Sequence, residues 1–350
     1  MTRRNIPGGW RTLADGSTKW RLPYRDPATG RQTSRTFPTK GDAVAFLDEL
    51  HHADRAGTWV EPSAGRVRFS AFAAEWAEAQ DWAPSTRQAF TAALSRIEQR
   101  LGPDRRLDQV DELVLARLRK QLTDDYARTT ATITLHYASA VMRAAYQWRR
   151  VPHDVTERLK PPKDRSGRGD GVHADDVPTR AEVVALIDAA PPAWRAAVAL
   201  GASGLRVGEV LGLHSEQYDS ATGTLVVDRQ LQRIDGADRF PLPKRDKVRT
   251  IMLPDWARAD LDDHLAEHQG GGLLFRNRAG QPRRRDVFYS TVWRPTLVRI
   301  GQPGDRYRFH SLRHWCASSM LAEGAPLTAV AGHLGDTVER SEERRVGKEC

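Results

Sequence analysis

Residues 201–213 read GASGLRVGEVLGL and place two charged residues inside an otherwise apolar stretch. The apolar spacing predicts helices over 192–202 and 206–213, with Arg206 opening the second one. Glu209 follows one turn later on the same helix face. In most proteins an arginine and a glutamate three residues apart form a solvated surface ion pair. The role of this pair therefore depends on what the rest of the sequence places near it.

Three later stretches also carry isolated polar residues. In LPKRDKVRTIMLP, Lys244 falls at a predicted hairpin turn between two strands. In FHSLRHWCASSML, helical spacing puts His310 and Arg313 on one face near the start of a helix. In AGHLGD, His333 and Asp336 are again three residues apart, at the end of a short helix. Each stretch is a weak signal by itself, because a solvated or core role is the ordinary alternative.

All four stretches fall in one predicted unit. A T-x-x-E capping box at Thr179 and Glu182 opens its first helix. The segments GTLVVDRQLQRI, DRFPLPK and KVRTIMLP predict three strands joined by tight turns, after which helices return. We expect residues 179–339 to form a mixed, mainly α domain with a three-stranded antiparallel sheet. Residues 151–178, rich in Pro, Gly, Ser and charge, are expected to form a linker.

Two smaller units precede this domain. Amphipathic stripes over residues 67–150 predict a compact all-α bundle. Residues 1–60 predict three strands, with a hairpin turn at Asp15-Gly16, followed by a helix. The alternative for their basic residues is an ordinary solvated surface. The basic residues that we expect to contact nucleic acid are Arg11, Lys19, Arg21, Arg25, Arg35, Arg87 and Arg96.

The composition indicates a polyanionic partner. The 350 residues carry a formal net charge of +9 with a pI near 9.8, and only eight of the 54 basic residues are lysines. Arginine grips phosphate bidentately, so this bias favours a nucleic acid, although a GC-rich genome also enriches arginine. No apolar run approaches the roughly 20 residues that span a membrane, and no secretory signal opens the sequence. With only two cysteines, we expect a soluble, cytoplasmic protein.

Taken in order, the four stretches resemble the motifs of the tyrosine recombinase, or phage-type integrase, family. GLRVGE is similar to its first arginine box, HSLRH to its His-x-x-Arg box, and the PK before VRTIMLP to its hairpin lysine. The resemblance covers nearly the whole chain. It implies an arm-binding module at 1–60, a SAM-like core-binding domain at 67–150 and a catalytic domain at 179–339. The implied partner is double-stranded DNA with core and arm sites, bound by a tetramer.

The resemblance also assigns roles in phosphoryl transfer. Arg206 and Arg313 would neutralise the two non-bridging phosphate oxygens. His310 would add a hydrogen bond or move a proton, and Lys244 would protonate the leaving 5′ oxygen, with Lys247 as the second candidate. A covalent phosphotyrosine stores the energy of the broken bond, so no cofactor and no metal is expected.

One supporting residue and the nucleophile complete this implied site. Glu209 would orient a neighbour without touching phosphate. The family's tyrosine lies about nine residues beyond a His or Trp, and two registers are open. The family has this His or Trp in an L-G-H context. If AGH is aligned with that context, the residue is His333. If LGD is aligned with it, the residue is Asp336 and the packing leucine of the pattern is kept, which slightly favours this second register. Both registers place the tyrosine near 342–345, where the sequence reads EERR, and none of the seven tyrosines follows Tyr307.

The last eleven residues, 340–350, read RSEERRVGKEC. Codons that encode these eleven residues can spell the sequence of a common short-read sequencing adapter. We therefore expect the native coding sequence to stop near Glu339 and this tail to be non-native, the alternative being an ordinary charged terminus. For the chain as written we expect DNA binding without strand cleavage.

Two other functions fit part of the pattern. A catalytically inactive DNA-binding regulator of the same fold would also lack the tyrosine, although intact Arg206, Lys244, His310 and Arg313 argue against long-relaxed catalysis. A type IB topoisomerase-like enzyme shares the arginine chemistry. The predicted arm module and helical bundle favour recombination over that alternative.

Overall fold

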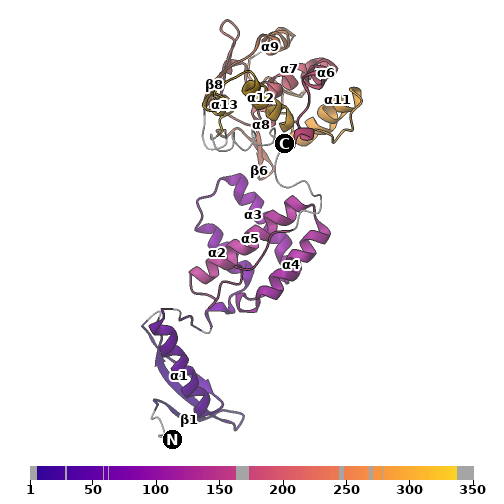
Figure 1. Cartoon of the computed structure of the whole chain (residues 1–350). Helices are drawn as coiled ribbons and strands as arrows, with labels where there is room; N and C mark the ends of the chain where they lie inside the picture. The colour runs from indigo at the N-terminus through magenta and orange to yellow at the C-terminus, as the bar shows by residue number, and fades with distance from the viewer. Residues whose placement is uncertain are drawn as a thin grey trace. The chain divides into compact units, whose positions relative to one another are not determined.

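The chain divides by its internal contacts into two units, Met1–Asp164 and Arg165–Cys350 (Figure 1). Each unit has its own hydrophobic core or cores. Within the described ranges, no helix is long and apolar enough to cross a membrane. The computed structural model describes residues 6–27, 30–57, 59–61, 63–162, 173–243, 248–267, 271–277 and 279–336.

The N-terminal unit begins with a three-stranded antiparallel sheet in the order β1-β2-β3, which one helix covers (Figure 1). The helix begins after Thr39, whose side chain accepts the backbone N–H of Asp42 while the Asp42 carboxylate accepts the N–H of Thr39. This arrangement confirms the predicted three strands and helix. The elements are β1 (Gly9–Thr12), β2 (Thr18–Arg25), β3 (Gln32–Phe37) and α1 (Lys40–Arg55).

Strict alternation along β2 gives this sheet two different faces. Trp20, Leu22 and Tyr24 are buried under α1, where they pack with Phe37 and Phe46. The residues between them point to the opposite face, which is open. The sheet therefore offers one apolar face to its own helix and one polar face for contacts with other molecules.

The rest of the N-terminal unit is a helical bundle, as predicted. Its helices pack around a core in which Phe72, Ile97, Leu118 and Met142 are fully or almost fully buried. Asp111 caps the third of these helices by accepting the N–H of Val114. The helices are α2 (Phe69–Glu78), α3 (Pro84–Leu101), α4 (Glu112–Asp125) and α5 (Arg128–Gln147).

The C-terminal unit is mainly helical and is built around α7, which packs against α6, α9 and α12 (Figure 1). Nearly every residue in the second half of α7 is buried, because aromatic residues such as Trp293 and Phe309 fill the same core. The helices are α6 (Arg180–Ala189), α7 (Pro192–Ala202), α8 (Val207–Leu211), α9 (Asp255–Glu267), α10 (Arg285–Phe288), α11 (Arg294–Arg299), α12 (His310–Ala322) and α13 (Leu327–Leu334).

A three-stranded antiparallel sheet lies in this unit, as predicted, but its strands differ from the expected ones. It has the order β4-β5-β8, whereas β6 and β7 form a separate two-stranded ribbon. The ribbon closes locally around Asp235 and Gly236, which both have positive φ. The sheet forms because buried Leu225 of β5 lies opposite buried Ile251 of β8. The strands are β4 (Tyr218–Asp219), β5 (Thr224–Val227), β6 (Gln232–Ile234), β7 (Ala237–Arg239) and β8 (Arg249–Met252).

Candidate functional site

Three helix ends in the C-terminal unit bring most of the predicted site residues together. Arg206 is the residue before α8, and Glu209 lies in the first turn of that helix. Arg313 lies in the first turn of α12. His333 is in the last turn of α13, and Asp336 follows directly after that helix. Arg206 and Glu209 lie more than 100 positions before the other three residues, so the cluster depends on the tertiary fold.

Glu209 is fully buried and is shared by two arginines. Its carboxylate accepts two hydrogen bonds from Arg206, one from Nη1 at 2.8 Å and one from the backbone N–H at 2.8 Å. It also accepts both terminal nitrogens of Arg249, at 3.1 and 2.8 Å. Burial acts to raise the pKa of Glu209, but the hydrogen bonds and charge of Arg249, together with Arg206, hold it below its ordinary value. Glu209 is therefore an anion that fixes two guanidinium groups.

Arg313 is fully buried, with 0% of its surface exposed. Its Nη1 donates to the carbonyl of Gly204 at 2.6 Å, and its Nη2 donates to the carbonyl of Leu334 and to Asp336. Gly204 has φ +97°, and a Cβ there would lie 2.8 Å from Leu334, so glycine is required to bring this carbonyl in. Burial, together with the charge of Arg206, lowers the pKa of Arg313 to about 10, which leaves the side chain charged at neutral pH.

Asp336 joins the two predicted phosphate-binding arginines. Its Oδ1 accepts Nη2 of Arg206 at 2.9 Å, and its Oδ2 accepts Nη2 of Arg313 at 3.0 Å. The carboxylate is only 5% exposed. Gly335 turns the chain here with φ +63°, and its backbone lies against Arg249, so that a Cβ would meet that side chain at 3.2 Å. The two arginines therefore converge on a single anionic group.

His333 enters the cluster differently from Asp336. Its ring Nε2 lies 2.9 Å from the carbonyl of Ser203, and its own carbonyl accepts Nε of Arg249 at 2.9 Å. Burial lowers the pKa of this imidazole, so the ring is held in its neutral form at neutral pH. Of the two candidates for the His/Trp place, Asp336 thus contacts both Arg206 and Arg313, whereas the ring of His333 contacts the backbone carbonyl of Ser203.

Arg249 is the residue of this cluster that the sequence reasoning missed. It is the first residue of β8, is 9% exposed, and binds Glu209 and the end of α13 at once. A signal for it was present, because strand alternation puts Arg249 on the same face as the buried residues Ile251 and Leu253. A charged residue in phase with core residues needs a buried counterion, and Glu209 supplies it.

His310 lies at the start of α12 and lines an open cavity of about 850 Å³. Its ring meets that of His314 edge to face at a centroid distance of 4.8 Å. Three arginines of this unit, Arg285, Arg306 and Arg308, line the same cavity.

The predicted general acid Lys244 and its alternative Lys247 lie outside the described residues. In the part of the chain that is described, no group of three or more His, Cys, Asp or Glu side chains could hold a metal ion.

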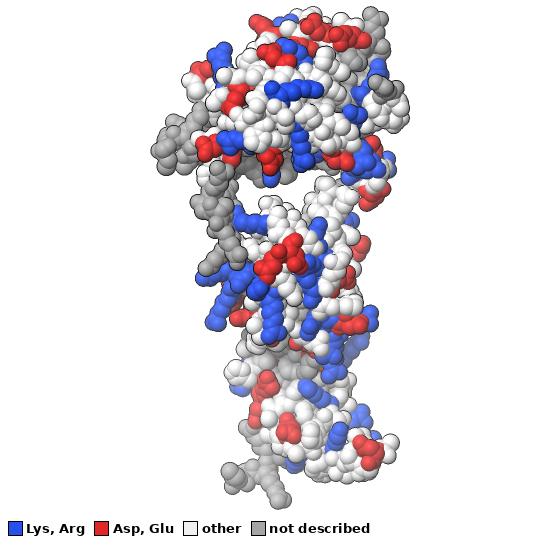
Figure 2. All heavy atoms as spheres, turned by 90° about the vertical axis from the view of Figure 1, so that its right-hand side faces the viewer, with Lys and Arg blue, Asp and Glu red and all other residues white. Residues whose placement is uncertain are grey.

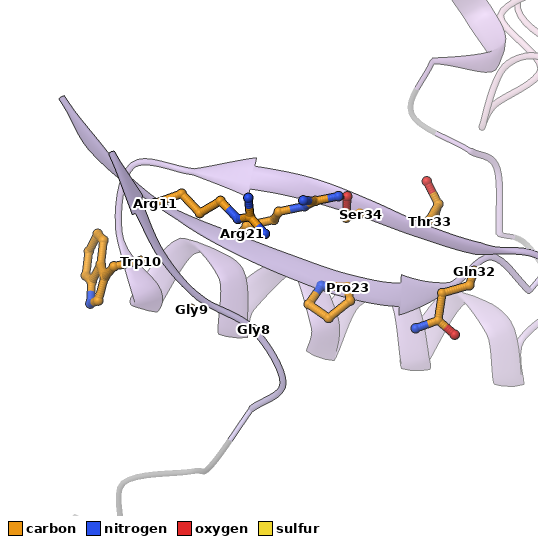
Figure 3. Close-up of a pocket in the computed structure, with 9 residues that line it drawn as sticks. All are labelled: Gly8, Gly9, Trp10, Arg11, Arg21, Pro23, Gln32, Thr33 and Ser34. Atoms are coloured by element: carbon orange, nitrogen blue, oxygen red, sulfur yellow. The ribbon is translucent and has the colours of Figure 1, made fainter. Parts of the chain in front are cut away.

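The open face of the N-terminal sheet carries four of the predicted nucleic-acid contacts. Strand pairing sets Arg11 opposite Lys19, and alternation places Arg21 and Arg25 on the same face. Figure 3 shows the Arg11 and Arg21 side chains lying along the sheet on the side away from α1. Arg21 Nε donates to Ser34 at 3.0 Å, and both arginines line a shallow hollow of about 710 Å³. This face is basic and polar.

Arg35 lies on the other face of that sheet. It pairs with Leu22, and its guanidinium stacks over the rings of Phe37 and Phe46 at 5.4 and 5.0 Å. Arg35 therefore shares the α1 side, whereas Arg11, Lys19, Arg21 and Arg25 do not. The alternation of β3 contained this information, since Arg35 is two residues from the buried Phe37.

The two predicted contacts on the bundle are partly engaged within it. Arg87 donates to the carbonyls of Ala77 and Gln80 at the end of α2, at 3.3 and 3.4 Å. Arg96 lies over the ring of Tyr126 at 5.5 Å. On the face drawn in Figure 2, Lys and Arg side chains gather over the helical bundle. The bundle keeps a basic surface, although these two arginines also have internal partners.

Comparison with known proteins agrees with this geometry. Residues 179–337 match the phage integrase family. A Tn1549 transposon integrase in complex with a circular intermediate DNA has a similar fold, with 15% identity and a TM-score of 0.69 over 79% of this chain and 94% of that chain. A lambda integrase dimer bound to a COC′ core site matches with 18% identity and a TM-score of 0.59, over 100% and 98% of the two chains.

A lambda integrase tetramer bound to a Holliday junction matches at the same TM-score of 0.59 with 18% identity, over 95% of this chain and 97% of that chain. Among curated proteins no sequence matches significantly. In both its helical and its β-sheet parts, the fold is thus similar to that of these DNA-bound integrases. The match to the phage integrase family covers residues 179–337, the part of the chain that contains the arginine cluster.

Proposed function

We propose that this chain is built for site-specific recombination of double-stranded DNA at a mobile element, acting in the cytoplasm. The observation that carries the proposal is the convergence of Arg206 and Arg313 on one carboxylate, at 2.9 and 3.0 Å. Two guanidinium groups held in this way present fixed donors to the two non-bridging oxygens of a phosphodiester. Because the carbonyls of Gly204 and Leu334 hold Arg313 and Glu209 holds Arg206, little reorganisation is needed when charge develops on the phosphate.

The surrounding residues support this pair. Glu209 holds Nη1 of Arg206 and both terminal nitrogens of Arg249, which leaves Nη2 of Arg206 for the anion between the two arginines, Asp336 in this structure. Arg249 is fully engaged with protein atoms, which makes it a positioning residue. His310 would donate a hydrogen bond to the phosphate or move a proton, and Lys244, or else Lys247, would protonate the leaving 5′ oxygen.

The nucleophile decides which part of the reaction this chain performs. In the family's reaction a tyrosine oxygen attacks phosphorus, the bond to the 5′ oxygen breaks, and that oxygen takes a proton. Residues 342–345 of this chain are EERR, and no tyrosine follows Tyr307. We therefore propose that the chain as given binds DNA without cutting it. This is also the behaviour of a catalytically inactive regulator of the same fold, which is the second candidate function.

The partner is double-stranded DNA in two kinds of contact. The C-terminal unit and the bundle would bind the core site, and the open sheet face with Arg11, Lys19, Arg21 and Arg25 would bind an arm site. Recombination joins two duplexes at four strand-exchange positions, so a tetramer on DNA is the expected assembly. Arg35 would not contact the arm site in this arrangement, because it lies on the α1 side.

Binding of a labelled 30-base-pair duplex tests the proposal. We expect Arg206→Gln to weaken binding by about tenfold or more, the cost of one charge-assisted phosphate contact. Arg180→Gln, at an exposed arginine that begins α6, removes the same charge and serves as the matched control. Equal affinities for Arg206→Gln and Arg180→Gln would contradict the assigned site.

A suicide duplex that traps a cleaved strand tests the second half of the proposal. The chain as given should bind this duplex and yield no covalent adduct on a denaturing gel. A covalent protein–DNA adduct would show that another residue acts as nucleophile and would overturn the assignment of binding without cleavage.

A further inference from the structure

We propose that Asp336 determines the affinity and selectivity of the phosphate site, because it is an internal anion that occupies the position of the phosphate until DNA displaces it. This inference rests on the proposed role of Arg206 and Arg313. It assigns to Asp336 a role in regulating access to that site, in place of a role in proton transfer.

The geometry is that of a bridging oxyanion. One carboxylate oxygen of Asp336 meets Arg206 Nη2 at 2.9 Å, and the other meets Arg313 Nη2 at 3.0 Å. A phosphodiester that used its two non-bridging oxygens would require the same two donors. Because Arg313 is 0% exposed and Asp336 only 5%, a phosphate cannot reach both guanidinium groups while Asp336 remains between them.

Charge balance makes the exchange feasible. The cluster contains three arginines and two carboxylates, and Glu209 is committed to Arg206 and Arg249. Asp336 supplies the remaining negative charge, between Arg206 and Arg313. A phosphodiester also carries one negative charge, so replacing Asp336 leaves the buried charge unchanged. Removing Asp336 without a replacement would leave Arg313 buried against Arg206 without its counterion.

An unsatisfied donor favours the incoming phosphate over the carboxylate. Nε of Arg313 is buried and has no hydrogen-bond partner among the described residues. In an arginine, Nε and one terminal nitrogen form an edge that binds an oxyanion bidentately. A carboxylate whose two oxygens are divided between two arginines has no oxygen left for Nε. Inorganic phosphate has further unesterified oxygens, and it can therefore satisfy a donor that Asp336 leaves unpaired.

The consequence is selectivity among anions. An anion must offer at least two acceptor oxygens to replace Asp336, so chloride does not compete, whereas phosphate does. The apparent affinity for phosphate is lowered by the fraction of time that Asp336 holds the site. If that fraction is about nine-tenths or more, removing the carboxylate should strengthen phosphate binding about tenfold or more.

The experiment measures the thermal stability of the full chain in rising inorganic phosphate, with sodium chloride replaced so that ionic strength stays constant. Ligand that binds only the folded state raises Tm, and the dependence on concentration gives an apparent Kd. Asp336→Asn should unfold at a lower temperature than the unchanged chain in chloride and should bind phosphate about tenfold more tightly. Asp336→Glu keeps the carboxylate and should show no such gain.

The matched control is Asp255→Asn at the exposed start of α9, which changes the net charge equally and should leave phosphate affinity unchanged. Phosphate affinity of Asp336→Asn equal to or weaker than that of the unchanged chain would overturn the inference. If Asp336→Asn does not fold in chloride, refolding in phosphate but not in chloride supports it, and failure in both overturns it.

Arg206→Gln distinguishes this inference from the proposed function. If Arg206→Gln leaves phosphate affinity unchanged in both the Asp336 and the Asp336→Asn backgrounds, the arginine pair is not the phosphate site and the proposed function fails. If Arg206→Gln weakens phosphate binding but Asp336→Asn does not strengthen it, the arginine site stands and only the role of Asp336 is wrong.

Discussion

The arginines of the C-terminal cluster and those of the N-terminal sheet are held in opposite ways, although the proposed function gives both the same kind of partner. Arg313 and Arg249 are buried, and each is held by carbonyl and carboxylate groups from other elements. Arg11 and Arg21 lie on an open sheet face. The buried arginines have a fixed position before any ligand arrives, as transition-state stabilisation requires. The exposed arginines supply positive charge on long side chains that can extend to phosphates, as recognition of a duplex backbone requires.

The comparison predicts the largest effect for loss of the buried counterion. Glu209→Gln would leave Arg249 buried without its carboxylate and Arg206 without its first ion pair. We expect a loss of about 3–5 kcal/mol in the free energy of unfolding of the C-terminal unit. Urea unfolding followed by hydrogen exchange in α7 measures it. Glu78→Gln, at an exposed partner of Arg87, is the control and should cost less than about 0.5 kcal/mol.

The exposed arginines should show the reverse pattern. The double variant Arg11→Gln/Arg21→Gln should leave the free energy of unfolding within about 0.5 kcal/mol of the unchanged chain. We expect duplex affinity to fall about tenfold or more, and the slope of log K against log salt to decrease by about 1 for each lost phosphate contact. Fluorescence anisotropy over a salt series measures both quantities. An unchanged slope would mean that this sheet face does not bind the DNA backbone.

A smaller effect concerns the pH dependence of the buried cluster. Burial lowers the pKa of His333 in the folded chain below its ordinary value of 6.5. As the pH falls below 6.5, the imidazole therefore takes up its proton in the unfolded chain first. Folding stability should therefore decrease over that range, and His333→Gln should flatten the decrease. Thermal unfolding between pH 7.5 and 5 checks this, with His51→Gln at an exposed residue of α1 as the control. An identical pH profile for His333→Gln would contradict the neutral buried ring.

The smallest predicted effect separates the two faces of the sheet. Arg35→Gln removes the guanidinium that stacks over Phe37 and Phe46. We expect a loss of about 0.5–1 kcal/mol in stability, the usual value of an exposed cation–π contact, and an unchanged salt slope for duplex binding. If the salt slope falls for Arg35→Gln as we expect for Arg11→Gln/Arg21→Gln, the α1 side of the sheet also contacts DNA.

Local sequence signals predicted much of this fold and site. The strands and helix of residues 1–60 and the helices of the bundle follow from alternation, capping residues and apolar stripes. Arg206, Glu209 and Arg313 were selected because their motifs, taken in order along the chain, resemble those of the integrase family. Arg249 and Arg35 could have been placed correctly as well, since each is in phase with buried residues of its strand.

Other features depend on contacts between distant segments. The Asp235-Gly236 turn indicates locally that β6 pairs with β7, but nothing local indicates that β8 pairs with β5. The same holds for the meeting of Asp336 with Arg206, 130 residues earlier in the chain. Spacing within AGHLGD left both His333 and Asp336 as candidates, with Asp336 slightly favoured, and only the tertiary fold separates their contacts.

The most direct test of the account is a structure of the chain bound to duplex DNA, in which the distances from Nη2 of Arg206 and of Arg313 to the nearest phosphate oxygens are measured. We predict that both nitrogens lie about 2.7–2.9 Å from oxygens of one phosphate, with Asp336 displaced. DNA held by the sheet face and the bundle alone, with Asp336 still between the two arginines, would contradict the assignment of this cluster as the phosphate site.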